Sequence, residues 1–319
     1  MENKMIWAYL IHLGEAMWGD FEPGDGGACI FTDRSSFDMN VWLDVTADLE
    51  RSKSCNMILI DVGDGVEYES HPEINRPGAL TKKQLSDEIQ RLRSLGFEVI
   101  PKLNFATSHD KWMGIYSRMV STPQYYQFCT DVIDEMCELF GHPRFFHLGM
   151  DEECCAVQKK LPICIVRQHD LYWHDINFLL KAVEKNGARP WLWADYIWHT
   201  PENEKDFLEN MSHDALLSNW YYGSWQGELF TEIRNAYAVL EAHGFDQVPT
   251  GSNCDKSREY TEENMLLTVD RCTKFIAPER LKGFMIAPWE MTTEIKRPRL
   301  DAAVDRLTEA HDFYYNKRG

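Results

Sequence analysis

The sequence predicts an α/β protein with a single (β/α)8 TIM barrel. Eight apolar runs of strand length alternate with eight helical patterns along the 319 residues. Most runs are continuously apolar, which is typical of parallel strands covered on both faces. An open doubly wound sheet is the alternative, but no glycine-rich phosphate loop follows the first run. No linker rich in Pro, Gly or Ser divides the chain, so residues 1–319 are predicted to form one catalytic domain.

The helices carry recognisable start and stop signals. In the clearest one Thr81 is placed to cap the N-terminus, Leu85, Ile89 and Leu92 share one face, and Gly96 ends the pattern. Strands are predicted at 5–13, 56–62, 97–105, 144–152, 189–198, 215–222, 247–253 and 282–290. Helices are predicted at about 36–54, 81–97, 122–141, 165–187, 203–211, 228–244, 261–278 and 299–315.

Composition narrows the partners and the compartment. A net charge of −18 argues against nucleic acid or an anionic membrane, because binding phosphates needs Lys and Arg. The short basic run 296–299 predicts a solvated loop. Nine cysteines without a CxxC pair indicate free thiols in a reducing compartment. No apolar run reaches the roughly 18 residues of a membrane span, and 5–13 predicts a strand rather than a signal peptide. We expect a cytoplasmic protein without a cofactor, and the sequence does not indicate its oligomeric state.

The active site of a barrel enzyme lies at the carboxyl ends of its strands. These ends are rich in carboxylates and aromatic side chains, and no Ser–His–Asp order or GxSxG motif accompanies them. A Mg²⁺ site on Asp61, Asp151 and Asp195 is possible, but it would leave the tryptophans without a role. The strand-end residues are Glu15, Trp18, Asp61, Asp64, Lys102, Asn104, His109, His147, Asp151, Glu152, Glu153, Trp193, Asp195, Asn219, Trp220, Tyr221, Tyr222, Ser252, Asn253, Asp255, Trp289 and Glu290.

Carboxylates with aromatic walls are typical of carbohydrate sites. The C–H faces of a sugar ring pack on indole, and its hydroxyl groups bind Asp, Glu, Asn and Tyr. Cleavage of a glycosidic bond needs a protonated acid beside the leaving oxygen. The run of three acids, Asp151, Glu152 and Glu153, suits this need, because like charge and desolvation keep one carboxyl protonated. The alternative is a polar turn that caps the next helix.

The segment HLGMDE, residues 147–152, resembles the His-x-Gly-x-Asp-Glu signature of glycoside hydrolase family 20, the β-N-acetylhexosaminidases. The likeness extends over roughly 5–292, with the segments 71–74, 79–104 and 287–290 similar to passages of that family. It implies substrate-assisted, retaining cleavage of a terminal β-linked N-acetylhexosamine. Glu152 would then be the general acid and base, and Asp151 would hold the acetamido group. The resemblance and the strand ends together assign the sugar contacts to His147, Trp193, Asp195, Trp220, Tyr221 or Tyr222, Trp289 and Glu290. Which of the two tyrosines faces the pocket depends on the strand register.

The sequence also departs from that family. No arginine stands at the end of the first strand, NFATSHDKW replaces a Pro-Gly-His segment, and Glu153 occupies a usually aliphatic place. The sugar, or its place in a glycan, is therefore expected to differ. Two alternatives remain. One is a retaining glycosidase with an enzyme carboxylate as nucleophile, for which the end of strand seven offers only Asp255. The other is a sugar-binding barrel without catalysis.

Overall fold

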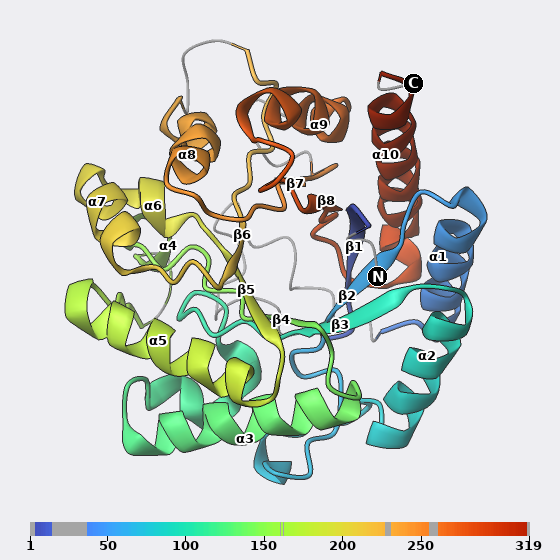
Figure 1. Cartoon of the computed structure of the whole chain (residues 1–319). Helices are drawn as coiled ribbons and strands as arrows, with labels where there is room; N and C mark the ends of the chain where they lie inside the picture. The colour runs from blue at the N-terminus through green and yellow to red at the C-terminus, as the bar shows by residue number, and fades with distance from the viewer. Residues whose placement is uncertain are drawn as a thin grey trace.

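The computed structural model describes residues 4–14, 37–159, 161, 163–226, 231–254 and 261–317. Its centre is one sheet of eight parallel strands in the order β6-β5-β4-β3-β2-β1-β8-β7 (Figure 1). The strands are β1 (Ile6–His12), β2 (Met57–Asp61), β3 (Glu98–Lys102), β4 (Phe145–His147), β5 (Arg189–Trp193), β6 (Leu216–Ser218), β7 (Thr250–Gly251) and β8 (Gly283–Ile286).

The sheet closes on itself between β6 and β7. The amide of Leu217 donates to the carbonyl of Asp246 at 3.0 Å, and the amide of Thr250 donates to the carbonyl of Asn219 at 3.0 Å. Parallel bridges pair the same segments, at Leu217 with Gln247 and at Trp220 with Thr250. The predicted (β/α)8 barrel is therefore confirmed, and the open-sheet alternative is wrong.

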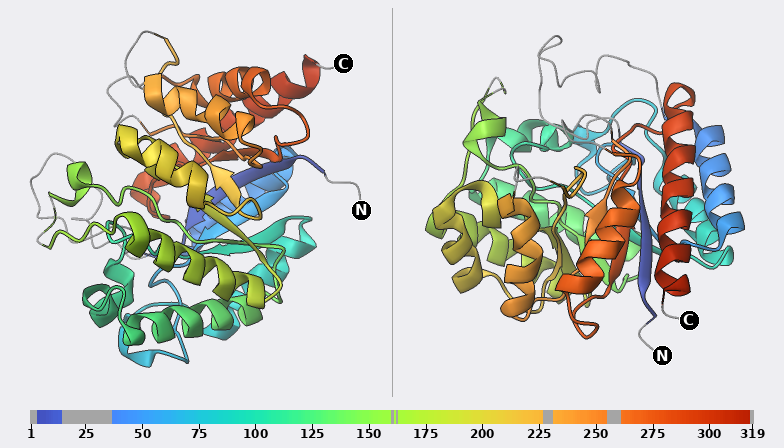
Figure 2. Two further views of the ribbon diagram at one scale, coloured as in Figure 1. Left: turned by 60° about the vertical axis from the view of Figure 1, so that its left-hand side comes forward. Right: turned by 90° about the horizontal axis from the view of Figure 1, so that it is seen from above.

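One long helix follows each strand and packs outside the barrel (Figures 1 and 2). The predicted caps form: Thr81 and Gln84 make a reciprocal capping box, and Thr122 accepts from the amide of Tyr125. The long helices are α1 (Met39–Ser52), α2 (Lys82–Ser94), α3 (Pro123–Leu139), α5 (His169–Lys185), α7 (Pro201–Asn210), α8 (Thr231–Ala242), α9 (Asn264–Phe275) and α10 (Arg297–Asn316).

Shorter helices lie in the loops that follow the strands. They are η1 (Pro72–Ile74), η2 (Lys111–Arg118), α4 (Cys155–Gln158), α6 (Tyr196–His199) and η3 (Glu294–Lys296). The basic run 296–299 was predicted as a loop, but it ends η3 and begins α10, where Pro298 fits the first turn. Within the described ranges, no helix is long and apolar enough to cross a membrane.

Alternation along each strand divides the core in two. On β1, Ile6, Ala8 and Leu10 fill the barrel, whereas Trp7 and Tyr9 pack in the layer between strands and helices. Both faces are buried, which explains the continuous apolar runs.

The inward side chains become polar at the carboxyl ends of the strands. His12, Asp61, Lys102 and His147 lie side by side in register on β1 to β4, all buried. Lys102 Nζ donates to Asp61 Oδ2 at 2.5 Å, and His12 Nε2 lies 3.4 Å from the same oxygen. Burial lowers the pKa of His12 to about 4 although Asp61 opposes the change, so this imidazole is neutral at pH 7. This polar layer forms the floor of the barrel mouth.

Candidate active site

A sharp turn follows β4 where the sequence predicted more strand. β4 stops at His147 rather than residue 152, because Gly149, Met150 and Glu152 have φ values of 69°, 72° and 59°. Such left-handed conformations do not continue a strand. A Cβ on Gly149 would approach Asn104 Oδ1 to 2.2 Å, so only glycine fits there. Asn104 Oδ1 also accepts from the amide of Met150 at 3.0 Å. The turn is therefore built against the loop after β3.

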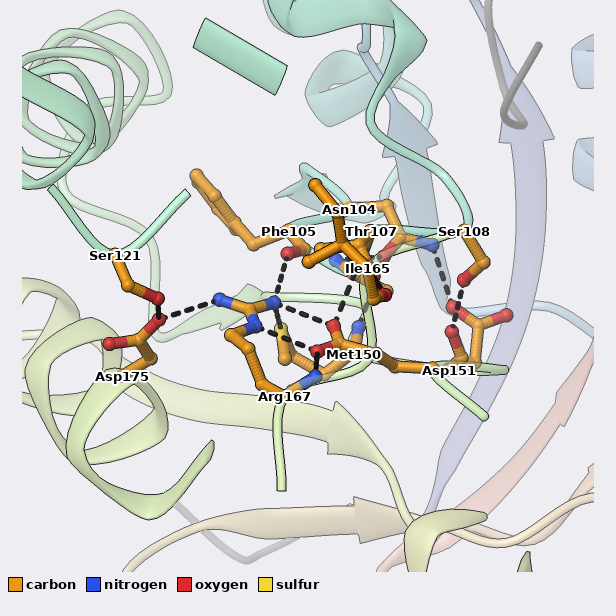
Figure 3. A network of polar contacts seen from close by, with 12 residues as sticks. Asn104, Phe105, Thr107, Ser108, Ser121, Met150, Asp151, Ile165, Arg167 and Asp175 are labelled. Carbon is orange, nitrogen blue, oxygen red and sulfur yellow. Dashed lines mark hydrogen bonds and ion pairs between the residues drawn. The ribbon is translucent and has the colours of Figure 1, made fainter. Parts of the chain in front are cut away.

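Asp151 is buried and surrounded by groups that favour its charged form. Asn104 Nδ2 donates to its Oδ1 at 2.7 Å, and Ser108 Oγ donates to its backbone carbonyl at 2.7 Å (Figure 3). His109 Nε2 lies 3.3 Å from its Oδ2. Burial alone would raise the pKa of Asp151. The charges of His109 and Lys102 and the hydrogen bonds of His109 and Asn104 outweigh burial and lower this pKa below its usual value. Asp151 is thus a fixed negative charge.

Glu152 differs from its neighbour in exposure and in its contacts. Its side chain is 35% exposed, and its Oε2 lies 3.4 Å from His109 Nε2. Its backbone amide donates to Asp195 Oδ2 at 2.7 Å, and that oxygen also lies 2.8 Å from His199 Nε2. Glu152 is therefore open to a group outside the protein, while its backbone is held by the segment that follows β5.

His109 lies between the two carboxylates. Burial alone would lower its pKa, but the charges and hydrogen bonds of Asp151 and Glu152 raise it to about 10. The imidazole is therefore cationic at neutral pH. Sequence reasoning placed His109 at the end of the third strand without assigning it a role. Only its position at the end of a predicted strand pointed to His109, because sequence spacing does not reveal the loop that turns it toward Asp151.

Asp195 supports the turn from the next strand. It is fully buried, and burial raises the pKa of its carboxyl; the His199 imidazole opposes this change, and the charge of Asp151 adds to it. Asp195 was predicted to bind sugar hydroxyl groups. Its Oδ2 is occupied by Glu152 and His199, while its Oδ1 has no hydrogen-bond partner among the described residues.

Aromatic side chains from three strand ends meet beside the turn. Trp193 packs against Trp289 with ring centres 5.6 Å apart, and Trp220 stacks on Tyr222 at 5.1 Å. Trp289 Nε1 donates to Tyr222 Oη at 2.8 Å, which joins the two pairs. Trp193 is 1% exposed and belongs to the barrel interior, whereas Trp220 and Trp289 are only partly buried. Trp220 and Trp289 are thus the indoles that a sugar ring could reach.

The two tyrosines after β6 point in different directions. Tyr222 is partly buried; burial raises the pKa of its hydroxyl, Trp289 opposes the change, and the charges of Asp151 and Glu152 add to it. Its stacking on Trp220 and the hydrogen bond from Trp289 place Tyr222 in the aromatic cluster at the barrel mouth. Tyr221 instead packs in the outer core, edge-on to Trp225 at 5.4 Å.

His147 and Glu290 are both buried and occupied by other protein groups. His147 Nδ1 accepts from the amide of Gly149 at 3.0 Å, and its ring lies 4.6 Å from that of Trp193. Burial, with the charge of Lys102, lowers the pKa of His147 well below its usual value. Glu290 Oε2 lies 3.0 Å from Lys296 Nζ, and its Oε1 lies 3.5 Å from Arg299 Nε.

Two other candidates are held in buried ion pairs, and three lie outside the described residues. Asp61 is paired with Lys102, and Glu153 is buried against Arg167. No group of three or more His, Cys, Asp or Glu side chains suited to a metal ion occurs in the part of the chain that the structure describes. Glu15, Trp18 and Asp255 are outside the described residues.

In sequence the chain matches no family model and no curated protein. In structure it is similar to a β-N-acetylhexosaminidase from Bacteroides fragilis, with a TM-score of 0.62 and 14% identity over 95% of this chain and 65% of that one. Dispersin B gives 0.60 and 15% over 96% and 99%. A family 20 exo-β-N-acetylglucosaminidase from Vibrio harveyi gives 0.60 and 15% over 98% and 57%.

These similarities establish the class of fold, a (β/α)8 barrel of the kind found in several glycoside hydrolases. The chain spans less than two thirds of the Bacteroides and Vibrio enzymes and nearly all of Dispersin B. At identities of 14–15%, these similarities show the fold alone. The chemistry depends on the side chains at the barrel mouth.

Proposed function

We propose that the protein is a glycoside hydrolase that removes terminal β-linked N-acetylhexosamine with retention of configuration. The pair Asp151 and Glu152 carries this proposal: one carboxylate is buried and kept charged, and the adjacent one is partly exposed. The resemblance of 147–152 to the family 20 signature agrees with it, as do the β-N-acetylhexosaminidases among the structural neighbours.

The proposed reaction uses the substrate's own acetamido group as nucleophile. Its oxygen attacks the anomeric carbon while the bond to the leaving oxygen breaks, and Glu152 donates its proton to that oxygen. Asp151 binds the acetamido N–H and stabilises the positive oxazolinium ring that forms. Water then attacks the anomeric carbon, Glu152 takes its proton, and the acetamido group is restored.

Electrostatics favour the role of Asp151, and exposure favours that of Glu152. Asp151 has Asn104 and His109 within contact distance, so its charge persists while positive charge develops on the sugar. Glu152 shares His109 but is open to solvent and to a leaving group. Trp220 and Trp289 are placed to pack on the C–H faces of the sugar. Because Tyr222 Oη accepts from Trp289, its own proton is left for the acetamido oxygen.

The test is hydrolysis of aryl β-N-acetylglucosaminide and β-N-acetylgalactosaminide by the wild type and by Glu152→Gln. We expect cleavage of at least one substrate by the wild type and a loss of kcat/KM of about 10²–10⁴-fold in the variant. Glu209→Gln, which changes an exposed acid of α7, is the control and keeps wild-type activity. A wild type that cleaves neither substrate, or an unimpaired Glu152→Gln, contradicts the proposal.

A further inference from the structure

The third acid of the turn, Glu153, forms a buried ion pair that the reaction does not use. Glu153 and Arg167 are each 2% exposed. Arg167 Nε donates to Glu153 Oε1 at 2.7 Å, and Nη2 donates to Oε2 at 2.6 Å, which is a bidentate contact. Each carboxylate oxygen also accepts a backbone amide, from Arg167 at 2.9 Å and from Thr107 at 3.1 Å.

Every N–H of the Arg167 guanidinium has a partner. Besides Glu153, its Nη1 donates to Asp175 Oδ2 at 2.9 Å and to Tyr125 Oη at 3.3 Å, and its Nη2 donates to the carbonyl of Phe105 at 2.9 Å. Five donors held in a planar fork leave the side chain one orientation. Arg167 is therefore a rigid junction.

This junction ties together the two loops that carry His109 and the acids Asp151 and Glu152. Phe105 and Thr107 belong to the loop after β3, and Glu153 ends the turn after β4. The same β3 loop supplies Ser108, which holds the backbone of Asp151, and His109, which lies between the two proposed catalytic acids.

The turn after β4 needs such support because its backbone is strained. Met150 and Glu152 have φ values of 72° and 59°, and this left-handed conformation is unfavourable for residues other than glycine. They persist only where the surroundings determine them. Arg167 contacts the turn on both sides of the acids, at Glu153 through its nitrogens and at Met150 Sδ at 4.0 Å.

We propose that Arg167, acting through Glu153, is a positioning residue that holds the strained turn and thereby orients Asp151 and Glu152. This inference rests on the proposed function for its kinetic part. A buried ion pair contributes little stability relative to apolar side chains of the same volume. The pair instead fixes the orientation of the turn. Glu153, which stands where family 20 usually has an aliphatic residue, thereby supports the site.

The test compares Arg167→Lys, which keeps the charge and loses the fork, with Glu135→Gln. Glu135 is a buried acid of α3 that accepts from Ser70 and lies outside the proposed site, so it is the matched control. The readouts of the test are thermal unfolding, kcat and KM, and amide hydrogen exchange of peptides that cover 149–153. If Arg167→Lys does not fold, Glu153→Gln, which keeps the shape of the side chain, replaces it.

The positioning role predicts a folded Arg167→Lys whose 149–153 amides exchange faster, whose kcat falls about 10–100-fold, and whose KM changes less than about 3-fold. The control loses stability without either effect. Unchanged exchange at 149–153, or unchanged kcat in a folded variant, overturns the inference. A wild type that cleaves no N-acetylhexosaminide defeats the proposed function, and the exchange measurement still decides the role of Arg167.

Discussion

The turn after β4 and the end of β8 both present a buried carboxylate at the barrel mouth, in different company. Asp151 is held by the amide of Asn104 and the imidazole of His109. Glu290 lies between the ammonium of Lys296 and the guanidinium of Arg299, on the segment that leads into α10. Position and burial do not distinguish the two acids. Their partners do, because one set belongs to the loops of the site and the other joins β8 to its helix.

The largest expected effect is on kcat, and it distinguishes the turn after β4 from the end of β8. Asp151→Asn should lower kcat by about 10²–10³-fold, because a neutral amide cannot stabilise the positive charge that develops on the sugar. Thermal unfolding of the variant checks that it folds, and aryl N-acetylhexosaminide kinetics measure the loss. A variant with unchanged kcat would remove Asp151 from the mechanism.

The second prediction compares neighbouring tyrosines. Tyr222→Phe should lower kcat about 10-fold, because it removes the hydroxyl that accepts from Trp289 and that is proposed to bind the acetamido oxygen. Tyr221→Phe is the matched control, since that ring packs in the outer core, and it should leave kcat within about 2-fold. Equal losses in both variants would contradict the assignment of Tyr222 to the site.

Glu290→Gln should show the opposite pattern from Asp151→Asn. Removing the carboxylate takes away the anion that lies beside Lys296 and Arg299, so the free energy of unfolding should fall by about 1–3 kcal/mol. We expect KM to stay within about 3-fold of the wild type. Urea unfolding and steady-state kinetics measure the two quantities. A large rise in KM with unchanged stability would instead support the sequence-based expectation that Glu290 binds sugar hydroxyl groups.

The smallest effect concerns Asp110, next to His109. Its Oδ2 is buried without a hydrogen-bond partner among the described residues, and burial raises the pKa of this carboxyl to about 7. Folding is then opposed as pH rises from the unfolded pKa near 4 to about 7, where Asp110 must lose its proton. Asp110→Asn should match the wild type below pH 4 and be more stable by on the order of 1–2 kcal/mol at pH 8. Unfolding at both pH values measures this, and equal stability at pH 8 would contradict it.

Local signals predicted the barrel well. Runs such as 5–13 and 56–62 are apolar because both faces are covered, and caps such as Thr81 act within one turn of helix. The ends of the apolar runs also locate Asp61, Lys102 and His147, which lie side by side at the ends of β2, β3 and β4.

The details of the site depend on distant contacts that spacing does not reveal. The strand predicted at 144–152 stops at His147 because Asn104 and Asp195, each more than 40 residues from the turn, bind its amides. The direction of Tyr222 rather than Tyr221 follows from the register after β6. The sequence predicts a solvated run at 296–299, because the ion pair with Glu290 is apparent only in three dimensions.

The most direct test of the central claim varies the nucleophile within the substrate. Aryl N-acetylhexosaminides with mono-, di- and trifluoroacetyl groups have progressively weaker acetamido oxygens. If this oxygen attacks the anomeric carbon beside Asp151 and Glu152, kcat/KM should fall steeply with each added fluorine. A rate that is the same across the series, as an enzyme carboxylate nucleophile would give, would contradict the account.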